Sequence, residues 1–165
     1  MNLLNRWLDK IDDYLTYISA GTIFLMMFWI FADAFMRYAF NNAIAGTMEL
    51  TGEYLLVIIV YFAISYTQKH NGHVNVNFLY RKFSKSTKRV VGLISNVLTL
   101  TVLVILGIEN FHEGLRYLTN NIQSIGPLKV PLAPALMIIT LGIFILCLRL
   151  IIDSINIIRN KKEFE

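Results

Sequence analysis

The sequence has few charged residues and almost no cysteine. Asp, Glu, Lys and Arg make up 16% of the 165 residues, whereas 56% are hydrophobic, and the mean hydropathy is +0.56. This composition is too apolar for an ordinary soluble domain and predicts a membrane protein. The single cysteine, Cys147, lies in an apolar run and has no partner for an internal disulfide. We expect it to pack as a small hydrophobic residue.

The sequence also lacks the patterns that catalysis and cofactor binding need. It has no nucleophile with an attendant base, no Gly-rich phosphate loop and no paired-carboxylate hydrolytic site. His70 and His73 flank a turn, His112 is expected on the opposite side of the membrane, and none of the three lies in an uncharged run. We therefore expect no enzyme, no catalytic residue, no metal and no cofactor, haem included.

What the sequence does contain is uncharged runs long enough to cross a membrane. Residues 14–32, 90–108 and 130–148 include no Asp, Glu, Lys or Arg, and a span needs about 20 mostly apolar residues. A fourth run, 54–68, reaches only about 22 Å, so it must extend toward the N-terminus, which brings Glu53 to the membrane edge. We predict an all-α integral membrane protein forming one domain, with four transmembrane helices at about 14–36, 49–68, 90–112 and 131–152.

Lys and Arg are distributed unevenly around these spans. They concentrate in the connection 69–89 and at both ends of the chain, whereas the other connections carry only Arg37, Arg116 and Lys129. The positive-inside rule then places both termini and the 69–89 connection in the cytoplasm, and the 113–130 loop in the periplasm. These flanks also account for the sequence pI of about 9.2, so we expect no nucleic-acid partner.

Two segments outside the spans show helical spacing of apolar residues. Residues 1–13 have the pattern of an amphipathic helix, which would lie in the lipid interface with Trp7 at the headgroup boundary, or pack against a partner subunit. The 69–89 connection would form either a second helix at the lipid surface, with Arg81, Lys82 and Lys85 facing the headgroups, or a solvated basic loop.

Four ionisable residues lie at the ends of the first two predicted spans. Asp33 and Arg37 are four residues apart, which allows an ion pair along one helix face. Glu49 and Glu53 have the same spacing, so their like charges need a cation or a proton nearby. The cluster is either an ion or proton site in the membrane, or a structural arrangement at a helix N-terminus in which Arg37 bridges two spans.

The order and spacing of four motifs resemble one family. These are DAFMRYAFNN (33–42), MELTGEYLLV (48–57), GHVNVNFL (72–79) and KVPLAP (129–134). With the chain length and the four spans, they resemble the DctQ-like small permease subunits of tripartite ATP-independent periplasmic (TRAP) transporters over nearly the whole chain. One departure is visible, because Asn75 and Asn77 stand in a segment where members often carry an acidic residue.

The resemblance implies a multi-pass subunit of a bacterial inner membrane transporter that imports an organic acid, such as a dicarboxylate or sialic acid, by sodium symport. A large permease subunit would carry the substrate and sodium sites, and a periplasmic binding protein would deliver the substrate. This chain would be a scaffold, with Arg37, Glu49 and Glu53 fixing the first two spans. Binding-protein docking would involve the periplasmic residues Glu109, Glu113, Arg116 and Lys129.

Two other classes stay open as alternatives. A self-sufficient small four-helix transporter usually has a carboxylate near the middle of a span, whereas the first run here has none before Asp33. A membrane anchor for a redox enzyme would need axial histidines on facing helices at the depth of the bundle.

Overall fold

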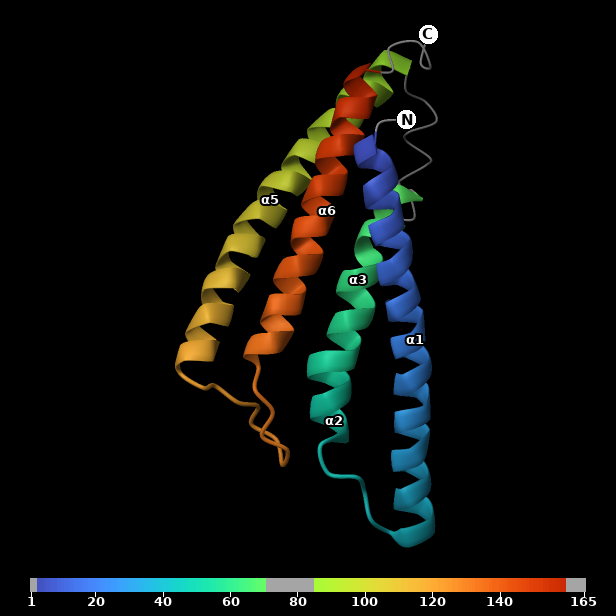
Figure 1. Cartoon of the computed structure of the whole chain (residues 1–165), viewed down its shortest axis with the longest axis vertical. Helices are drawn as coiled ribbons and strands as arrows, with labels where there is room; N and C mark the ends of the chain where they lie inside the picture. Colours follow the sequence, from blue (N-terminus) through green and yellow to red (C-terminus); the bar gives the residue numbers. More distant parts are fainter. Residues whose placement is uncertain (1–2, 71–84, 160–165) are drawn as a thin grey trace.

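The computed structural model describes residues 3–70 and 85–159 (Figure 1). The elements, in chain order, are α1 (Leu3–Phe40), α2 (Thr47–Glu49), the π-helix η1 (Leu50–Leu55), α3 (Leu56–Lys69), α5 (Lys85–Thr119) and α6 (Ala133–Arg159). Because α2, η1 and α3 follow one another without a gap, they act as one helical segment. Within the described residues, four helical segments are long and apolar enough to cross a membrane, 6–40, 47–69, 90–119 and 133–158, and this confirms the expected all-helical fold with four spans for that part of the chain.

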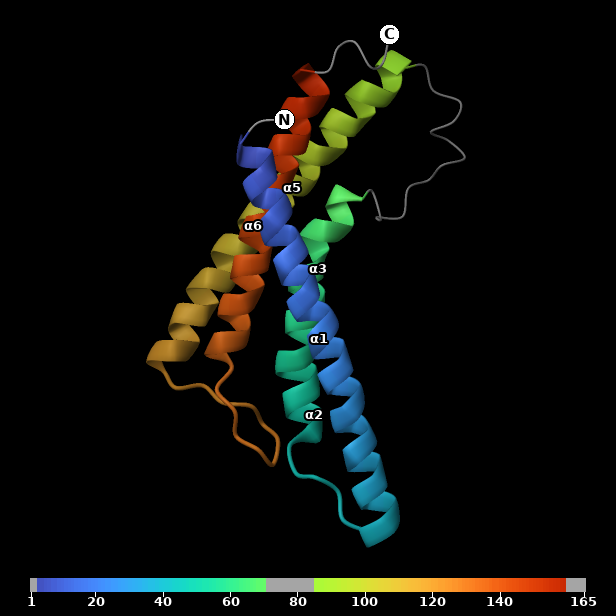
Figure 2. The ribbon, with the colours of Figure 1, turned by 45° about the vertical axis from the view of Figure 1, so that its right-hand side comes forward.

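The four segments form two helical hairpins. α1 packs against α3, α5 packs against α6, and contacts between α3 and α6 join the two pairs. The hairpins converge at the end where α1 begins and α6 ends, here called the terminus end. They diverge toward the opposite end, here called the loop end, which carries the connections 41–46 and 120–132 (Figures 1 and 2).

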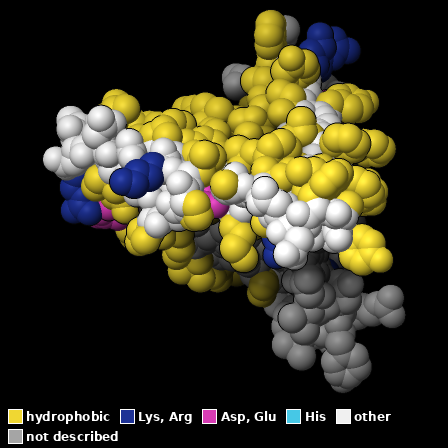
Figure 3. All heavy atoms as spheres, turned by 90° about the horizontal axis from the view of Figure 1, so that it is seen from below, with side chains coloured by type: hydrophobic (Ala, Val, Ile, Leu, Met, Phe, Trp, Pro, Cys, Tyr) yellow, Lys and Arg dark blue, Asp and Glu magenta, His cyan; other side chains and the backbone are white. Residues whose placement is uncertain are grey.

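Little of the apolar surface is buried within the chain itself. The buried side chains include a row on α6, represented by Ile143, Leu146 and Leu150, because this helix contacts both α5 and α3. α1 and α5 expose most of their large apolar side chains, and hydrophobic atoms cover much of the surface seen from the loop end (Figure 3). Such extensive apolar surface needs lipid or protein around it.

α1 runs without a break from residue 3 to residue 40, so the segment 3–13 belongs to the same helix as the first span. Within this segment, Trp7 is exposed, whereas Leu8 and Asp12 are buried against the rest of the chain. The structure therefore shows no separate interfacial helix in residues 3–13. The predicted basic segment with Arg81 and Lys82 lies outside the described residues, and Lys85 is the first residue of α5.

α5 continues as a helix to Thr119, beyond residue 112, where we predicted the third span to end. The helix ends where Asn121 adopts a left-handed backbone with φ of 53°, a conformation that Asn tolerates better than most residues and that terminates helices. Glu109, Glu113 and Arg116 thus lie on the last turns of a rigid helix.

Two close contacts hold neighbouring helices together between the two ends. The Ser19 hydroxyl of α1 donates a hydrogen bond of 2.6 Å to the Ile59 carbonyl of α3. Gly142 of α6 lies against the backbone of Tyr61 in α3, where an added Cβ would be 2.5 Å from the Tyr61 carbonyl oxygen. Small residues at such crossings let membrane helices approach closely.

We expect Gly142→Ala to destabilise the bundle, because the new methyl group would push α6 away from backbone atoms that cannot yield. Overpacking of this kind costs about 1–3 kcal/mol, and thermal unfolding in detergent, followed by circular dichroism, would show a lower midpoint. Gly21→Ala is the matched control, since a Cβ at this helical position meets nothing within 4 Å. Equal midpoints for the two variants would mean that α3 and α6 do not touch here.

Candidate functional site

Arg149 of α6 is the centre of an ion network at the terminus end. Its Nη1 atom lies 2.9 Å from Oδ1 of Asp9 and 3.4 Å from Oδ2 of Asp12, both on α1. Its Nε atom lies 3.8 Å from Oδ1 of Asp153, one helical turn further along α6. Arg149 therefore links the first helix of the chain to the last.

Lys69, the last residue of α3, extends this network to a third helix. Its Nζ atom lies 3.3 Å from Oδ1 of Asp9 and 3.3 Å from Oδ1 of Asp13. Asp9 is thus shared between Lys69 and Arg149. The result is a single cluster of charges that joins α1, α3 and α6 where the two hairpins converge.

Burial makes the Arg149 contacts energetically significant. Asp12 has an exposed fraction of 0%, and the Arg149 side chain is 10% exposed. Neither carboxylate oxygen of Asp12 has a hydrogen bond from the residues that the structure describes, so Arg149 is the cation that offsets its buried charge. Removing one partner of such a pair leaves an uncompensated charge out of water.

This network was not predicted from the sequence. Asp9 and Arg149 are separated by 140 positions, and Asp9, Asp12 and Asp13 fitted the polar face of a surface helix equally well. The one available signal was that these aspartates and the basic residues Lys69 and Arg149 all flank spans on the same predicted side of the membrane.

At the loop end, Asp33 and Arg37 form the ion pair expected from their spacing. Arg37 Nη2 lies 2.7 Å from Asp33 Oδ2, and the Arg37 side chain is 66% exposed. The second oxygen of Asp33 accepts a hydrogen bond of 2.7 Å from the Ile44 N–H. Because Asp33 is buried, this bond fixes the 41–46 connection against the end of α1.

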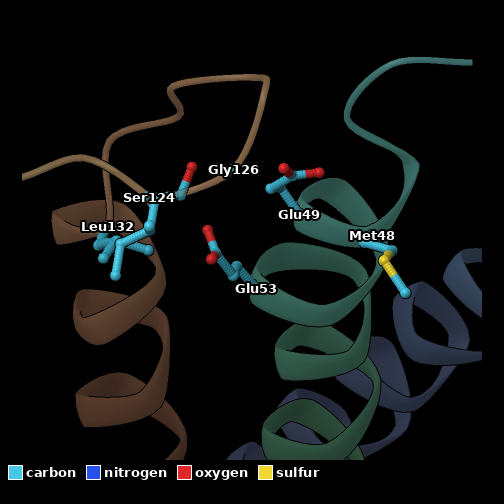
Figure 4. A pocket seen from close by; sticks show the side chains of 7 residues that line it. Met48, Glu49, Glu53, Ser124, Gly126 and Leu132 are labelled. Atoms are coloured by element: carbon cyan, nitrogen blue, oxygen red, sulfur yellow. The ribbon is translucent and has the colours of Figure 1, made fainter.

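Glu49 and Glu53 lie apart from that pair. Neither forms an ion pair with Arg37 or with any other Lys or Arg among the described residues, so the structure does not show the predicted bridge. Both carboxylates instead line an open pocket of about 350 Å³ (Figure 4). The other lining residues are Met48, Ser124, Ile125, Gly126 and Leu132.

The 120–132 loop forms the wall of this pocket and is held by its own hydrogen bonds. The buried Ser124 hydroxyl donates a hydrogen bond of 2.7 Å to the Leu128 carbonyl and accepts one of 3.2 Å from the Val130 N–H. The Ser124 N–H donates a hydrogen bond of 2.9 Å to the Val130 carbonyl. The Tyr54 hydroxyl of η1 donates to the Pro131 carbonyl. The loop is therefore fixed both to itself and to the helix opposite.

Glycine allows the loop to approach the Glu49 carboxylate. A Cβ at Gly126 would lie 1.4 Å from Glu49 Oε1, and a Cβ at Gly46 would lie 2.6 Å from Leu128. Gly46 also has φ of 87°, a backbone conformation that glycine adopts without strain. Position 46 therefore needs glycine, whereas a side chain at residue 126 would displace the Glu49 carboxylate from its place against the loop.

Glu53 lies within the π-helix η1. The Leu56 N–H bonds the carbonyl of Thr51, five residues earlier, and the Thr51 hydroxyl donates 2.6 Å to the Thr47 carbonyl. π-Helical turns are rare and occur frequently at functional sites. Hydrophobic periodicity gave no indication of this turn, because the apolar pattern of 47–69 continues through it.

The residues expected to dock the binding protein all lie at the loop end, but they do not form one cluster. Arg116 Nη2 pairs with Glu113 Oε1 at 2.5 Å on the exposed face of α5. Glu109 and Lys129 are also exposed, and no ion pair involves them in the described part of the chain. Nor do the described residues contain a group of three or more His, Cys, Asp or Glu that could hold a metal ion.

Comparison with known proteins points to one family. A family model described as "Tripartite ATP-independent periplasmic transporters, DctQ component" matches residues 26–160. A protein of Haemophilus influenzae with the name "Putative TRAP transporter small permease protein" is 22% identical over 99 residues, which are 60% of this chain and 58% of that relative. The matched part is thus less than two thirds of the relative's length. No solved structure matches the chain.

We expect Arg149→Met to destabilise the protein strongly, because it leaves the Asp12 carboxylate buried without a cation. Breaking a buried pair in this way costs roughly 3–5 kcal/mol, measurable as the free energy of unfolding in detergent titrated with sodium dodecyl sulfate. Arg116→Met is the control, since its ion pair with Glu113 is exposed on both sides and such a pair contributes only about 0–1 kcal/mol.

Adding Asp12→Asn to Arg149→Met should recover part of the loss, because the uncompensated charge is then gone. If the free energy of unfolding of Arg149→Met equals that of the arginine control variant, the assigned role of Arg149 is wrong.

Proposed function

Because this chain belongs to the DctQ family of TRAP transporter components, we propose that it is the scaffold subunit of a sodium-coupled importer of an organic acid. The family is a transporter component rather than an enzyme family, and with four apolar helices the chain is a multi-pass inner membrane protein. Membership implies a tripartite system with a large permease and a periplasmic binding protein. Family membership also argues against the two alternatives that the sequence left open, a self-sufficient four-helix transporter and a membrane anchor for a redox enzyme.

One observation carries the scaffold role, namely that the charged side chains of the described residues lie at the two ends of the bundle. An imported organic anion needs cationic groups or helix N-termini near the middle of the membrane. The runs 14–32, 90–108 and 130–148 contain no Lys or Arg, and α1, α5 and α6, which cover residues 14–32, 90–108 and 133–148, have no break. We therefore assign the substrate and sodium sites to the large permease.

The exposed apolar faces and the ion network support the same assignment. α1 and α5 offer wide surfaces for a second membrane protein, and the network around Arg149 fixes three helices relative to one another. A subunit of this kind can serve as the stationary element against which a partner moves while carrying substrate. The terminus end would face the cytoplasm and the loop end the periplasm, following the positions of Lys and Arg.

Reconstituted uptake tests the proposal directly. We expect proteoliposomes that contain the large permease, its binding protein and this chain to accumulate a labelled organic acid when a sodium gradient is applied. Omitting this chain should reduce the initial rate at least about tenfold, to the level seen without a sodium gradient. Equal uptake without the chain would show that it is not an obligatory subunit.

A second expectation concerns docking at the loop end. Lys129→Glu should raise the concentration of binding protein that gives half-maximal uptake, because it reverses an exposed charge on the proposed docking face. It should leave the maximal rate unchanged. Lys10→Glu, the same substitution at the terminus end, is the control. Identical titration curves for the two variants would remove Lys129 from the docking surface.

A further inference from the structure

We propose that the pocket between Glu49, Glu53 and the 120–132 loop receives an arginine side chain of the large permease subunit. This inference rests on the proposed function, because it names the contact by which the scaffold would hold its partner. An arginine from the partner takes the place that the sequence pattern assigned to Arg37 of the same chain.

The unpaired charge of the pocket is the first reason. Glu49 is 8% exposed and has neither a hydrogen bond nor an ion pair with any residue that the structure describes. The Oε2 atom of Glu53 is likewise buried and without a partner there. A buried carboxylate is stabilised by a neighbouring cation, but Arg37 and Arg116 are paired with Asp33 and Glu113, and the exposed Lys129 of the 120–132 loop forms no ion pair with either glutamate.

The pocket is built into the fold rather than formed by chance at a loose surface. The Ser124 hydrogen bonds hold the loop, the Tyr54 hydroxyl ties it to η1, and Gly126 gives Glu49 its place against the loop backbone. Figure 4 shows the Glu53 carboxylate directed into the space between η1 and the start of α6, with Glu49 beside the loop.

The lining favours an arginine over a metal ion. Two carboxylates are too few ligands for a dedicated metal site, the Ser124 hydroxyl already makes two hydrogen bonds, and no group of three metal-ligating acidic, His or Cys side chains occurs in residues 3–70 and 85–159. The rim is apolar, because Met48 is 85% exposed and Ile125 is fully exposed. An arginine has methylenes that would cover this rim and a planar guanidinium with five donors for the carboxylates.

The buried charge of Glu49 is always present, and this favours the large permease over the binding protein as the source of the arginine. A binding protein attaches and leaves in each cycle, and each departure would return the buried Glu49 to an unpaired state. A subunit that stays associated in the membrane keeps the pair intact. Glu49 also lies in the segment 47–69, which is long and apolar enough to cross the membrane.

Photo-crosslinking in the assembled complex tests the proposal. A photoreactive amino acid is placed at Ile125, and the chain is co-expressed with the large permease and the binding protein. We expect a crosslink to the large permease at a peptide containing arginine, and an approximately tenfold loss of this product in a Glu49→Gln, Glu53→Gln background. Asn42→Ala, which removes an exposed polar side chain from the 41–46 connection at the same end, should leave the product unchanged.

The outcomes separate this inference from the proposed function. Unchanged crosslinking and co-purification in the double glutamine variant, or a crosslink to the binding protein instead, would overturn the arginine pocket while leaving the scaffold role intact. The arginine pocket is also wrong if substituting glutamine for the crosslinked arginine has no effect. If the unsubstituted chain fails to co-purify with the large permease, both the pocket and the scaffold role are wrong.

Discussion

The contact of Arg149 with Asp9 and Asp12 is the interaction on which the arrangement of the bundle depends. Membrane helices gain no hydrophobic driving force from packing on one another, so close packing and polar contacts must hold them. Here the two hairpins diverge toward the loop end, and the charges that join α1, α3 and α6 lie where they converge. The ion network therefore holds the two hairpins together at the terminus end.

A second set of contacts fixes the loop end. Asp33 holds the 41–46 connection, Tyr54 reaches the start of α6, and Gly126 admits Glu49 against the loop. The polar groups gather at the two ends because charges near the membrane centre are costly. Between the ends, the helices meet through small residues such as Gly142 and through the Ser19 hydroxyl. This distribution produces a frame with fixed ends and an apolar exterior for lipid or a partner protein.

The four helices and the family could be predicted from the sequence, because uncharged run length and local motifs carry that information. The Asp33–Arg37 pair could be predicted too, since its spacing is local. The Arg149 network could not, because its partners are brought together only by the packing of the first and last helices. The Glu49 pocket was also missed, since it depends on a loop whose hydrogen bonds leave no periodic pattern. The π-helix was missed because the apolar pattern of residues 47–69 continues through it. The sequence did single out Glu49 and Glu53, but it assigned Arg37 as their partner, because Arg37 is the nearest cation in the sequence and distances in space were not known.

The proposed role of this chain as a rigid frame beside a moving partner is tested most directly by a distance between the two hairpins at the loop end. Spin labels at Tyr38 and Leu118, both exposed, would be introduced together with Cys147→Ala and measured by double electron–electron resonance in the assembled complex. A rigid frame predicts one narrow distance distribution that stays the same with and without sodium and substrate. A broad distribution, or one that shifts when sodium and substrate are added, would contradict it.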